Sequence, residues 1–304
     1  MAGIESYSNT YIPKIWSTKL KFALFAQLTL THTTNTDFEG EIAKFGDSVL
    51  IRDVPNLEVF DYVAGAGLPK PQRPKPALIA LEINKGKGFH FEANMVETAQ
   101  MDIDFVDKFT QNGGEQLKQA IEQNVYSVAY ADAAAENCGA TAGKKTGYYN
   151  MGTGQSPKEI DGGTVIDWLG DACAVLDEQN VPTEGRFALI PAWLQGKIKT
   201  SELKAVYVTG DAQSMIRTGN IGMIHGFNLF MSNNLYMETV NNKLITNVIA
   251  GNKSAIGFAT QLTANEKIDN PNDFGKLIRA LQVYGFKTVR PECLVHACVT
   301  RKTA

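Results

Sequence analysis

The sequence predicts an α+β fold with a substantial sheet in its second half. A long segment with helical apolar spacing occupies residues 114–137, and short segments rich in β-branched and aromatic residues recur on both sides of it. The 304 residues are 44% hydrophobic and 20% charged, which is the composition of a globular chain with a sizeable core. The net charge of −3, without blocks of Lys or Arg, gives no footprint for tight nucleic-acid binding.

Residues 1–45 predict an arm that leads away from the body. Pro13 stands at a first-turn position, and apolar side chains follow near i, i+4 spacing, so residues 12–28 are expected to form an amphipathic helix. The stretch after it is polar and rich in turn formers. Residues 19–30 lack a small-residue cleavage site, so we expect no signal peptide, and no segment reaches the roughly 18 apolar residues of a membrane span.

The next part of the chain predicts a strand-rich hairpin with a projecting tip. Strands are expected over residues 47–55, 57–63, 77–83 and 88–94. Four prolines in residues 69–76 exclude both a helix and a central strand there. The tip also carries three cations without compensating charge in the segment: Lys70, Arg73 and Lys75. Such a loop either seeks an acidic surface or stays solvated.

The middle of the chain predicts the longest helix and then a loose connection. In residues 114–137, Leu117, Ile121 and Val125 share one helical face. Residues 138–163 show no periodicity and are rich in Gly, Ser and Thr, which favours a flexible connection and a boundary between subdomains.

The remaining segments alternate between helices and strands. Thr164 and Asp167 resemble an N-terminal capping pair for a helix that runs to about Gln179. The other elements are expected in this order: a strand at 185–191, a short helix at 192–198, strands at 221–232, 245–251 and 254–262, a helix or bent strand at 271–285, and a strand at 292–299. In the strand at 221–232, His225 shares a face with Met223 and Phe227 and is interpreted as a wall residue, and Ser232 to Asn234 form the turn that ends it.

No motif in the sequence predicts catalysis or a cofactor. "GATAGKKTG" at residues 139–147 lacks the spacing of a phosphate-binding loop and follows a helix rather than a strand. His296 and Cys298 are expected on one face of a strand, but two ligands do not hold a metal ion. No nucleophile motif accompanies the histidines. Four widely spaced cysteines favour free thiols and a reducing compartment. We therefore expect no enzyme, no cofactor and no metal site.

The order of the parts carries more information than any single motif. An arm "YIPKIWSTKLKFALFAQLTL" precedes a strand "GDSVLIRDVP", a proline-tipped hairpin, "ALIALEINKGKGFHFEANMVETAQMDID" and the long helix. The second half continues with "VPTEGRFALIPAWLQGKI", "GNIGMIHGFNLFMSNNL", "NKSAIGFATQL" and "YGFKTVRPECLVHACV". Over essentially its whole length the chain resembles the major capsid protein of tailed double-stranded-DNA bacteriophages, which has the Hong Kong 97-type coat fold.

The resemblance implies a division of the chain and a role for each part. Residues 1–45 would be the N-terminal arm, 46–98 the E-loop hairpin, 99–160 the peripheral domain with its spine helix at 114–137, 161–240 the axial domain, and 241–304 the return through the peripheral domain to the final strand. Lys70, Arg73 and Lys75 at the hairpin tip are then candidates for inter-subunit contact. We cannot match the covalent lysine–asparagine cross-link of some members to positions here, so no isopeptide bond is expected.

The resemblance also implies partners. The chain would assemble with itself, as pentamers and hexamers, into an icosahedral shell that encloses double-stranded DNA without sequence-specific binding and without a membrane. Scaffolding, portal and decoration proteins are further partners, the location is the virion capsid, and assembly takes place in the bacterial host cytoplasm. An encapsulin-type nanocompartment shell protein is the alternative within the same fold, and an uncharacterised soluble enzyme is the remote alternative.

Overall fold

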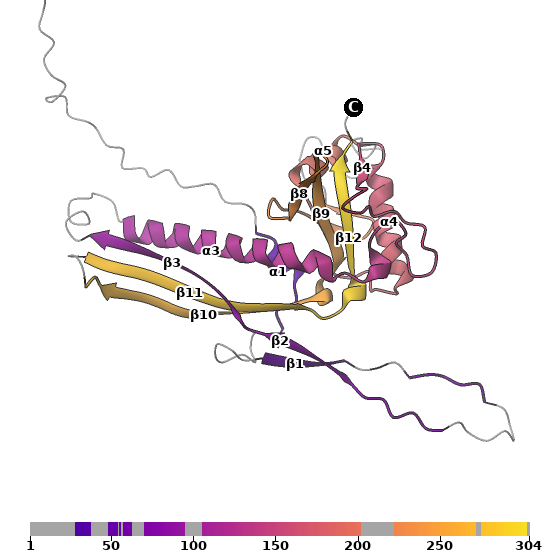
Figure 1. Ribbon diagram of the computed structural model, residues 1–304, viewed down its shortest axis with the longest axis horizontal. Coiled ribbons are helices and arrows are strands. Elements are labelled where there is room, and N and C mark those ends of the chain that lie inside the picture. The colour runs from indigo at the N-terminus through magenta and orange to yellow at the C-terminus, as the bar shows by residue number, and fades with distance from the viewer. Residues whose placement is uncertain are drawn as a thin grey trace, which may run out of the picture.

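A computed structural model describes residues 28–37, 48–53, 55, 57–62, 70–94, 105–201, 222–271 and 275–302 of the chain. The helix predicted over residues 12–28 lies outside these residues except for its last position. Two sheets make up the described body, and a hairpin projects from it (Figure 1). We call the two sheets the large sheet and the small sheet.

The large sheet contains the strands of the second half of the chain. Its strand order is β4-β12-β9-β5-β7-β6, and β8 pairs with β9 beside this path. The strands are β4 (Lys158–Ile160), β5 (Arg186–Ile190), β6 (Met223–Ile224), β7 (Phe227–Met231), β8 (Met237–Val240), β9 (Lys243–Asn252) and β12 (Leu294–Arg301). β5–β7 and β12–β4 are parallel, and the other pairs are antiparallel. All five residues of β5 are buried, as expected of a strand covered on both faces.

Two helices pack near this sheet where the sequence predicts them. α4 (Val165–Glu178) and α5 (Ala192–Lys199) match the expected helices closely. The predicted capping pair of α4 is wrong, because the side chain of Thr164 does not cap the helix. Instead, Asp161 Oδ1 accepts the backbone N–H groups of Gly163 and Thr164, each at 3.0 Å, in the turn before the helix. At the other end Asn180 adopts φ 56°, and Val181 N–H donates to Leu176 O, which forms a Schellman-type stop.

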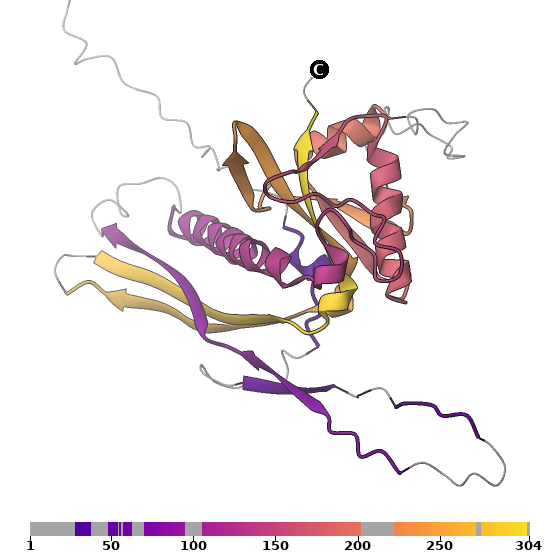
Figure 2. The ribbon, with the colours of Figure 1, turned by 45° about the vertical axis from the view of Figure 1, so that its right-hand side comes forward.

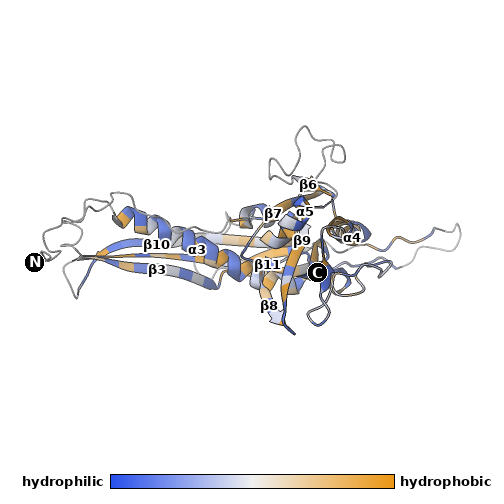
Figure 3. Cartoon of the chain, turned by 90° about the horizontal axis from the view of Figure 1, so that it is seen from above, coloured by the Kyte–Doolittle hydropathy of each residue, from blue (hydrophilic) through white to orange (hydrophobic). Residues whose placement is uncertain are grey.

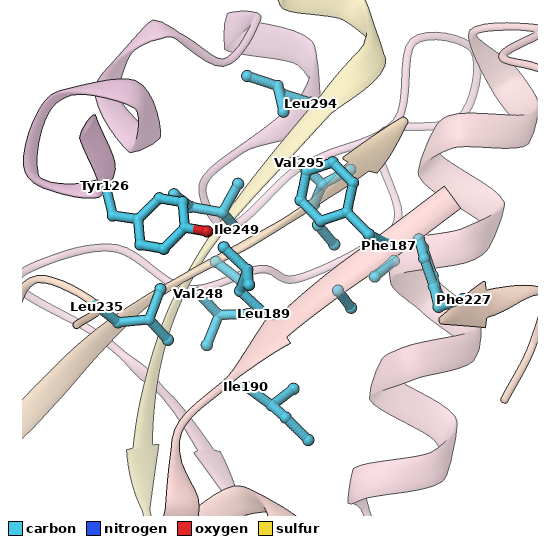
Figure 4. Close-up of a cluster of buried hydrophobic side chains, with 14 of the residues drawn as sticks. Tyr126, Phe187, Leu189, Ile190, Phe227, Leu235, Val248, Ile249, Leu294 and Val295 are labelled. Atoms are coloured by element: carbon cyan, nitrogen blue, oxygen red, sulfur yellow. The ribbon is translucent and has the colours of Figure 1, made fainter. Parts of the chain in front are cut away.

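The core of the molecule lies between the large sheet and the helices around it. Phe187 and Leu189 of β5, Ile249 of β9 and Val295 of β12 converge on one apolar cluster, which Figure 4 shows in close-up. Tyr126 reaches the same cluster from the long helix α3 (Phe105–Ala129). Figure 3 shows hydrophobic residues gathered on β9 and α4, whereas the far end of α3 is mainly hydrophilic.

The small sheet packs against α3. Its strand order is β10-β11-β3, and all three strands, β10 (Ile256–Asp269), β11 (Gly275–Thr288) and β3 (Lys85–Asn94), run antiparallel to their neighbours. Figures 1 and 2 show α3 lying along one face of this sheet. The segment predicted as a helix or bent strand over 271–285 is therefore a strand. β10 continues to Asp269, well past the expected end at 262.

The long helix differs from its prediction at both ends. It begins at Phe105 and ends at Ala129, not at 114 and 137. The prediction missed the turns before residue 114 because Gly113 and Gly114 follow them, and glycine is unfavourable in the interior of a helix. A Cβ at Gly113 would lie 2.8 Å from the ring of Phe89, so the glycine lets β3 pack closely. After Ala129 the chain forms 3-10 turns, η3 (Tyr130–Asp132) and η4 (Ala135–Asn137), separated by an extended Ala133.

The single strand predicted over 221–232 is also wrong. β6 and β7 pair antiparallel through Met223↔Asn228 and Ile224↔Phe227, so the segment is a hairpin. His225 and Gly226 form its two-residue turn with φ values of 48° and 77°, the positive-φ pattern of the turn that suits strand twist. His225 therefore does not alternate with its neighbours on a strand face. The turn predicted at Ser232 to Asn234 is confirmed, since β7 ends at Met231 and Asn234 N–H donates to Ser232 Oγ at 3.2 Å.

The connection over 138–163 is held in place by hydrogen bonds, so the prediction of a flexible link is wrong. Ala142 and Tyr149 exchange backbone hydrogen bonds of 2.7 and 3.0 Å, and Met151 is fully buried. The Glu178 carboxylate at the end of α4 accepts the N–H groups of Lys145 and Thr146 and the Thr146 hydroxyl. These bonds lower the pKa of Glu178, with the Thr146 hydroxyl as the largest cause.

Candidate interaction hairpin

The projecting hairpin begins with a regular two-stranded ladder. β1 (Ser48–Asp53) and β2 (Ala77–Glu82) pair antiparallel from Ser48↔Glu82 to Asp53↔Ala77. We call these two strands the hairpin root. Beyond them the outward limb, residues 57–62, and the return limb, residues 70–76, extend away from the body (Figure 2). Residues 57–62 form no strand, contrary to the prediction, because the facing limb is rich in proline and lacks the N–H groups that a ladder needs.

A side chain replaces the missing ladder between the limbs. Gln72 Oε1 accepts the backbone N–H of Glu58 at 3.0 Å, and Gln72 Nε2 donates to the carbonyl of Glu58 at 2.8 Å. This two-bond exchange mimics a hydrogen-bonded residue pair of antiparallel strands. The sequence offers no signal for it, since a glutamine among prolines has no distinctive pattern. We call this contact the Gln72 clip.

The three predicted contact residues all lie on the return limb. Lys70, Arg73 and Lys75 are exposed. Within the described residues none of the three forms an ion pair or a side-chain hydrogen bond. Their charges are therefore available to a partner surface, and the structure brings them together along one limb rather than at a pocket.

Large apolar side chains on the outward limb are exposed as well. Leu57 is 63% exposed, Val59 98% and Tyr62 72%, and Phe60 is half-exposed. The root adds two more on its outer face, Leu50 and Leu78. Contiguous exposed apolar surface on a folded chain is typical of an interaction site. The sequence prediction missed this feature because it treated residues 57–63 as a strand of the hairpin and not as an exposed limb.

The inner face of the root is anchored on the small sheet. Leu81 and Ile83 pack with Val283 of β11 and Ala259 of β10 in a separate apolar cluster, and all four are buried. Ile51 of β1 packs against the same cluster. Because burial of a large aliphatic side chain contributes about 1.5–3 kcal/mol, this cluster fixes the direction of the hairpin.

One glycine makes the crossing of hairpin and sheet possible. A Cβ at Gly285 of β11 would overlap the carbonyl oxygen of Glu82 and lie 2.9 Å from its carbonyl carbon and 3.0 Å from Ile83 Cα. The backbone between β2 and β3 therefore passes directly over β11 at this residue. Such close backbone approach is a known reason for glycine within a strand.

The His296–Cys298 pair and the four cysteines, which the sequence analysis considered as possible metal ligands or thiols, lie in the body. His296 Nε2 is 3.6 Å from Cys298 Sγ, which confirms their common face, and 2.8 Å from Asn247 Oδ1. In the part of the chain that the structure describes, no three His, Cys, Asp or Glu side chains are placed to hold a metal ion. Cys138, Cys173, Cys293 and Cys298 are free thiols, and burial raises the pKa of each. Among the described helices, none has the length and apolar character to cross a membrane.

His296 predicts a measurable dependence of stability on pH. Burial lowers its pKa from 6.5 to about 4, so between these values the unfolded chain binds a proton that the folded chain does not. Stability contributed by the neutral imidazole is thus complete above pH 6.5 and falls as the pH drops toward 4. In His296→Gln we expect the loss of stability at low pH to be smaller by on the order of 2 kcal/mol. This value is below the full effect of the pKa shift because the imidazole keeps some contact with water. Urea unfolding of both proteins at pH 7 and pH 4.5 measures the difference, and parallel pH profiles would contradict the prediction.

A two-sheet body with an exposed, projecting hairpin is typical of a subunit that assembles with other chains rather than of an enzyme with a closed pocket. Residues 79–297, more than half of the chain, match the family model described as phage capsid protein. The chain belongs to the phage capsid protein family.

Solved structures agree with this assignment. A structure from Mycobacterium phage Che8 has a TM-score of 0.76 and 25% identity, covering 95% of this chain and 97% of that chain. The capsid structure of cyanophage P-SCSP1u has a TM-score of 0.73 and 16% identity, with 96% and 94% covered. The capsid of Ralstonia phage GP4 has a TM-score of 0.67 and 12% identity, with 100% and 99% covered. Among curated proteins, no sequence matches the chain.

These findings confirm the resemblance seen in the sequence. The fold is the Hong Kong 97-type coat fold, and the protein is a major capsid protein of a tailed phage, a structural shell protein and not an enzyme. It associates with copies of itself into a shell and is located in the virion capsid. The encapsulin-type alternative gains no support over this assignment.

Proposed function

We propose that the chain forms pentamers and hexamers of an icosahedral shell around double-stranded DNA, and that the hairpin supplies the main contact between neighbouring subunits. The observation that supports this proposal is the hairpin itself, which combines a fixed root with exposed apolar and cationic limbs. Repeated weak contacts of this kind give a closed shell its stability. The near-neutral charge suits a container that holds DNA without gripping it.

The division of the chain follows the same proposal. Residues 1–45 act as the N-terminal arm, 46–98 as the E-loop hairpin, 99–160 as the peripheral domain, 161–240 as the axial domain, and 241–304 as the return to the final strand. Packing of α3 on the small sheet supports a peripheral unit, and packing of α4 against α5 supports an axial one. Assembly takes place in the bacterial host cytoplasm, with scaffolding, portal and decoration proteins as further partners.

On the hairpin, Lys70, Arg73 and Lys75 are proposed to contact an acidic surface of the neighbouring subunit. The apolar side chains of the outward limb add buried area to the same contact. Buried apolar area and charge both contribute to interfaces between subunits. We therefore expect the apolar outward limb and the cationic return limb each to contribute a separately measurable part of the stability of this contact.

Replacement of residues 66–76 by a short Gly/Ser turn tests the role of the hairpin. We expect the subunit to fold normally, because its described tip residues are exposed, and shell yield to fall at least about tenfold because one contact surface is lost. Negative-stain microscopy of the purified protein, with and without co-expressed scaffold, measures shell yield. Circular dichroism provides the control for folding.

Neutralisation of Lys70, Arg73 and Lys75 tests the contribution of charge to assembly separately from that of the length and shape of the hairpin. The variant Lys70→Ala/Arg73→Ala/Lys75→Ala keeps the length of the loop and is expected to assemble with reduced yield and a weaker dependence on salt. Unchanged yield and stability in the loop replacement would contradict the role of the hairpin. Persistent monomers of the unmodified protein under both conditions would contradict shell assembly as a whole.

A further inference from the structure

A buried carboxylate joins three segments that lie far apart in the sequence. Glu122 of α3 is 1% exposed. Its Oε2 accepts the backbone N–H groups of Thr29 and Leu30 at 2.7 and 3.1 Å. Its Oε1 accepts Asn234 Nδ2 at 3.0 Å, Ser232 Oγ at 3.2 Å and, more weakly, the Thr29 hydroxyl at 3.3 Å. Oε2 thus accepts hydrogen bonds from residues 29 and 30 of the arm, and Oε1 accepts mainly from the turn after β7.

A tyrosine one turn further along α3 extends the contact with the arm. Tyr126 is fully buried, and its hydroxyl lies 2.8 Å from Thr29 Oγ1 and 3.0 Å from Thr33 Oγ1. Thr33 closes the short helix α1 (Leu30–Thr33), which Figure 1 places beside α3. Residues 29–33 are therefore docked on α3 through polar contacts that water does not share.

The charge of Glu122 is stabilised by neutral donors. Within the described ranges no Lys, Arg or His forms an ion pair with it. A buried carboxylate is costly unless its lone pairs are hydrogen-bonded, so each of the two donor sets is needed to keep the charge in place. Loss of one set makes burial of the charge less favourable and so weakens the contact with the other.

We propose that Glu122 couples the docking of residues 29–33 to the fixing of the turn at residues 232–234, so that both segments are held or released together. The turn lies between β7 and β8 of the large sheet, whereas residues 29–33 belong to the N-terminal arm and include α1. The coupling is reciprocal, as any thermodynamic coupling between two sites must be. It does not depend on shell assembly, because every group belongs to one chain.

A cavity beside the carboxylate allows water to hydrate Glu122 in the released state, in which residues 29–33 have left α3. It measures about 220 Å³ and is lined by Leu30, Ile121, Glu122 and Phe258, among others. When residues 29–33 leave α3, the cavity loses Leu30 from its wall, and water reaches Glu122. The carboxylate is then satisfied by arm and turn in the docked state and by water in the released state, which gives two discrete arrangements.

Amide hydrogen exchange of the full chain tests the coupling in both directions. In Ser232→Ala/Asn234→Ala, which alters only the turn, we expect the amides of residues 29–34 to exchange about tenfold faster. In Thr29→Val/Thr33→Val, which alters only the arm, we expect a similar acceleration at the amide of Asn234. Thr→Val keeps side-chain volume nearly constant, and Ser232→Ala and Asn234→Ala only remove atoms, so neither variant introduces a steric clash and the fold is retained.

Two further variants complete the experiment. Glu122→Gln places an NH₂ group against N–H donors on one side, so exchange is expected to accelerate in both segments. Glu115→Gln is the matched control on the same helix, where the exposed carboxylate pairs with Lys118, and both segments should keep their exchange rates. Wild-type rates in the arm of the turn variant, or in the turn of the arm variant, would overturn the coupling even if Glu122→Gln does not fold.

Discussion

Gly285→Ala is expected to detach the hairpin root from the small sheet. The added methyl group meets backbone atoms of Glu82 and Ile83, which cannot rotate away as a side chain could. Overpacking of this kind costs up to about 3 kcal/mol, and the rigidity of the obstacle places this site at the upper end. The amides of residues 48–53 and 77–82 should then exchange on the order of 100-fold faster, as that free energy implies. Shell yield should fall in parallel, because the hairpin no longer points in a fixed direction.

Gly86→Ala on the neighbouring strand β3 is the matched control. A Cβ there would lie 3.6 Å from Leu281 Cδ1, 3.8 Å from Val283 Cγ1 and 4.0 Å from Gln282 O, which are ordinary contacts. Exchange at the root and shell yield should both stay at their normal values. If Gly285→Ala behaves like Gly86→Ala, the crossing at Gly285 does not set the direction of the hairpin.

Arg186→Met is expected to lower the free energy of unfolding by about 2 kcal/mol. The Arg186 side chain is 1% exposed, and its guanidinium donates to Val181 O at 2.6 Å, to Pro182 O at 3.0 Å and to Asp177 Oδ1 at 2.7 Å. Methionine fills a similar volume but leaves the carbonyl oxygen of the buried Val181 without the donor it has in the folded protein, and such a group costs about 1–3 kcal/mol. The Pro182 carbonyl still accepts from Asn252 Nδ2 at 3.3 Å. The exposed Asp177 returns to water at little cost. Urea unfolding at pH 7 measures the change.

Arg279→Met serves as the control for the loss of an arginine. Arg279 is more than half exposed and pairs with Glu266, so this surface pair contributes at most about 1 kcal/mol. A loss of stability in Arg186→Met no larger than in Arg279→Met would contradict the role of the buried guanidinium as the lock between α4 and β5.

Sequence periodicity predicted the elements whose buried face is continuous. α4, β5 and α5 lie within one or two residues of their expected bounds, because apolar residues recur there at helical or strand spacing without interruption. The order of parts predicted the fold itself, since arm, hairpin, long helix and second-half strands occur in the sequence of a known coat fold. The position of the hairpin tip followed from its prolines.

Features that depend on distant partners escaped prediction. The turn at His225 and Gly226 lacks the usual Asn-Gly signature, so a hairpin was taken for one strand. Gly113 interrupts the helical pattern, and the reason for a glycine at this position is visible only in the structure, where the ring of Phe89 packs against it. The burial of Glu122 and Arg186 has no local signal, because a charged residue is read as exposed until the donors or acceptors around it are known. Of the candidate site, sequence identified the cations but not the apolar limb or the anchoring of the root.

The Gln72 clip has a mechanical consequence for the hairpin when a neighbouring molecule pulls on one of its limbs. Because both bonds of Gln72 go to the backbone of Glu58, a pull on one limb is shared by the other before it reaches β1 and β2. The load then enters β1 and β2 together, and it does not open the six-pair ladder from its outer end at Asp53↔Ala77. A single glutamine thereby joins the outward limb to the proline-stiffened return limb, so that the two limbs bear tension together.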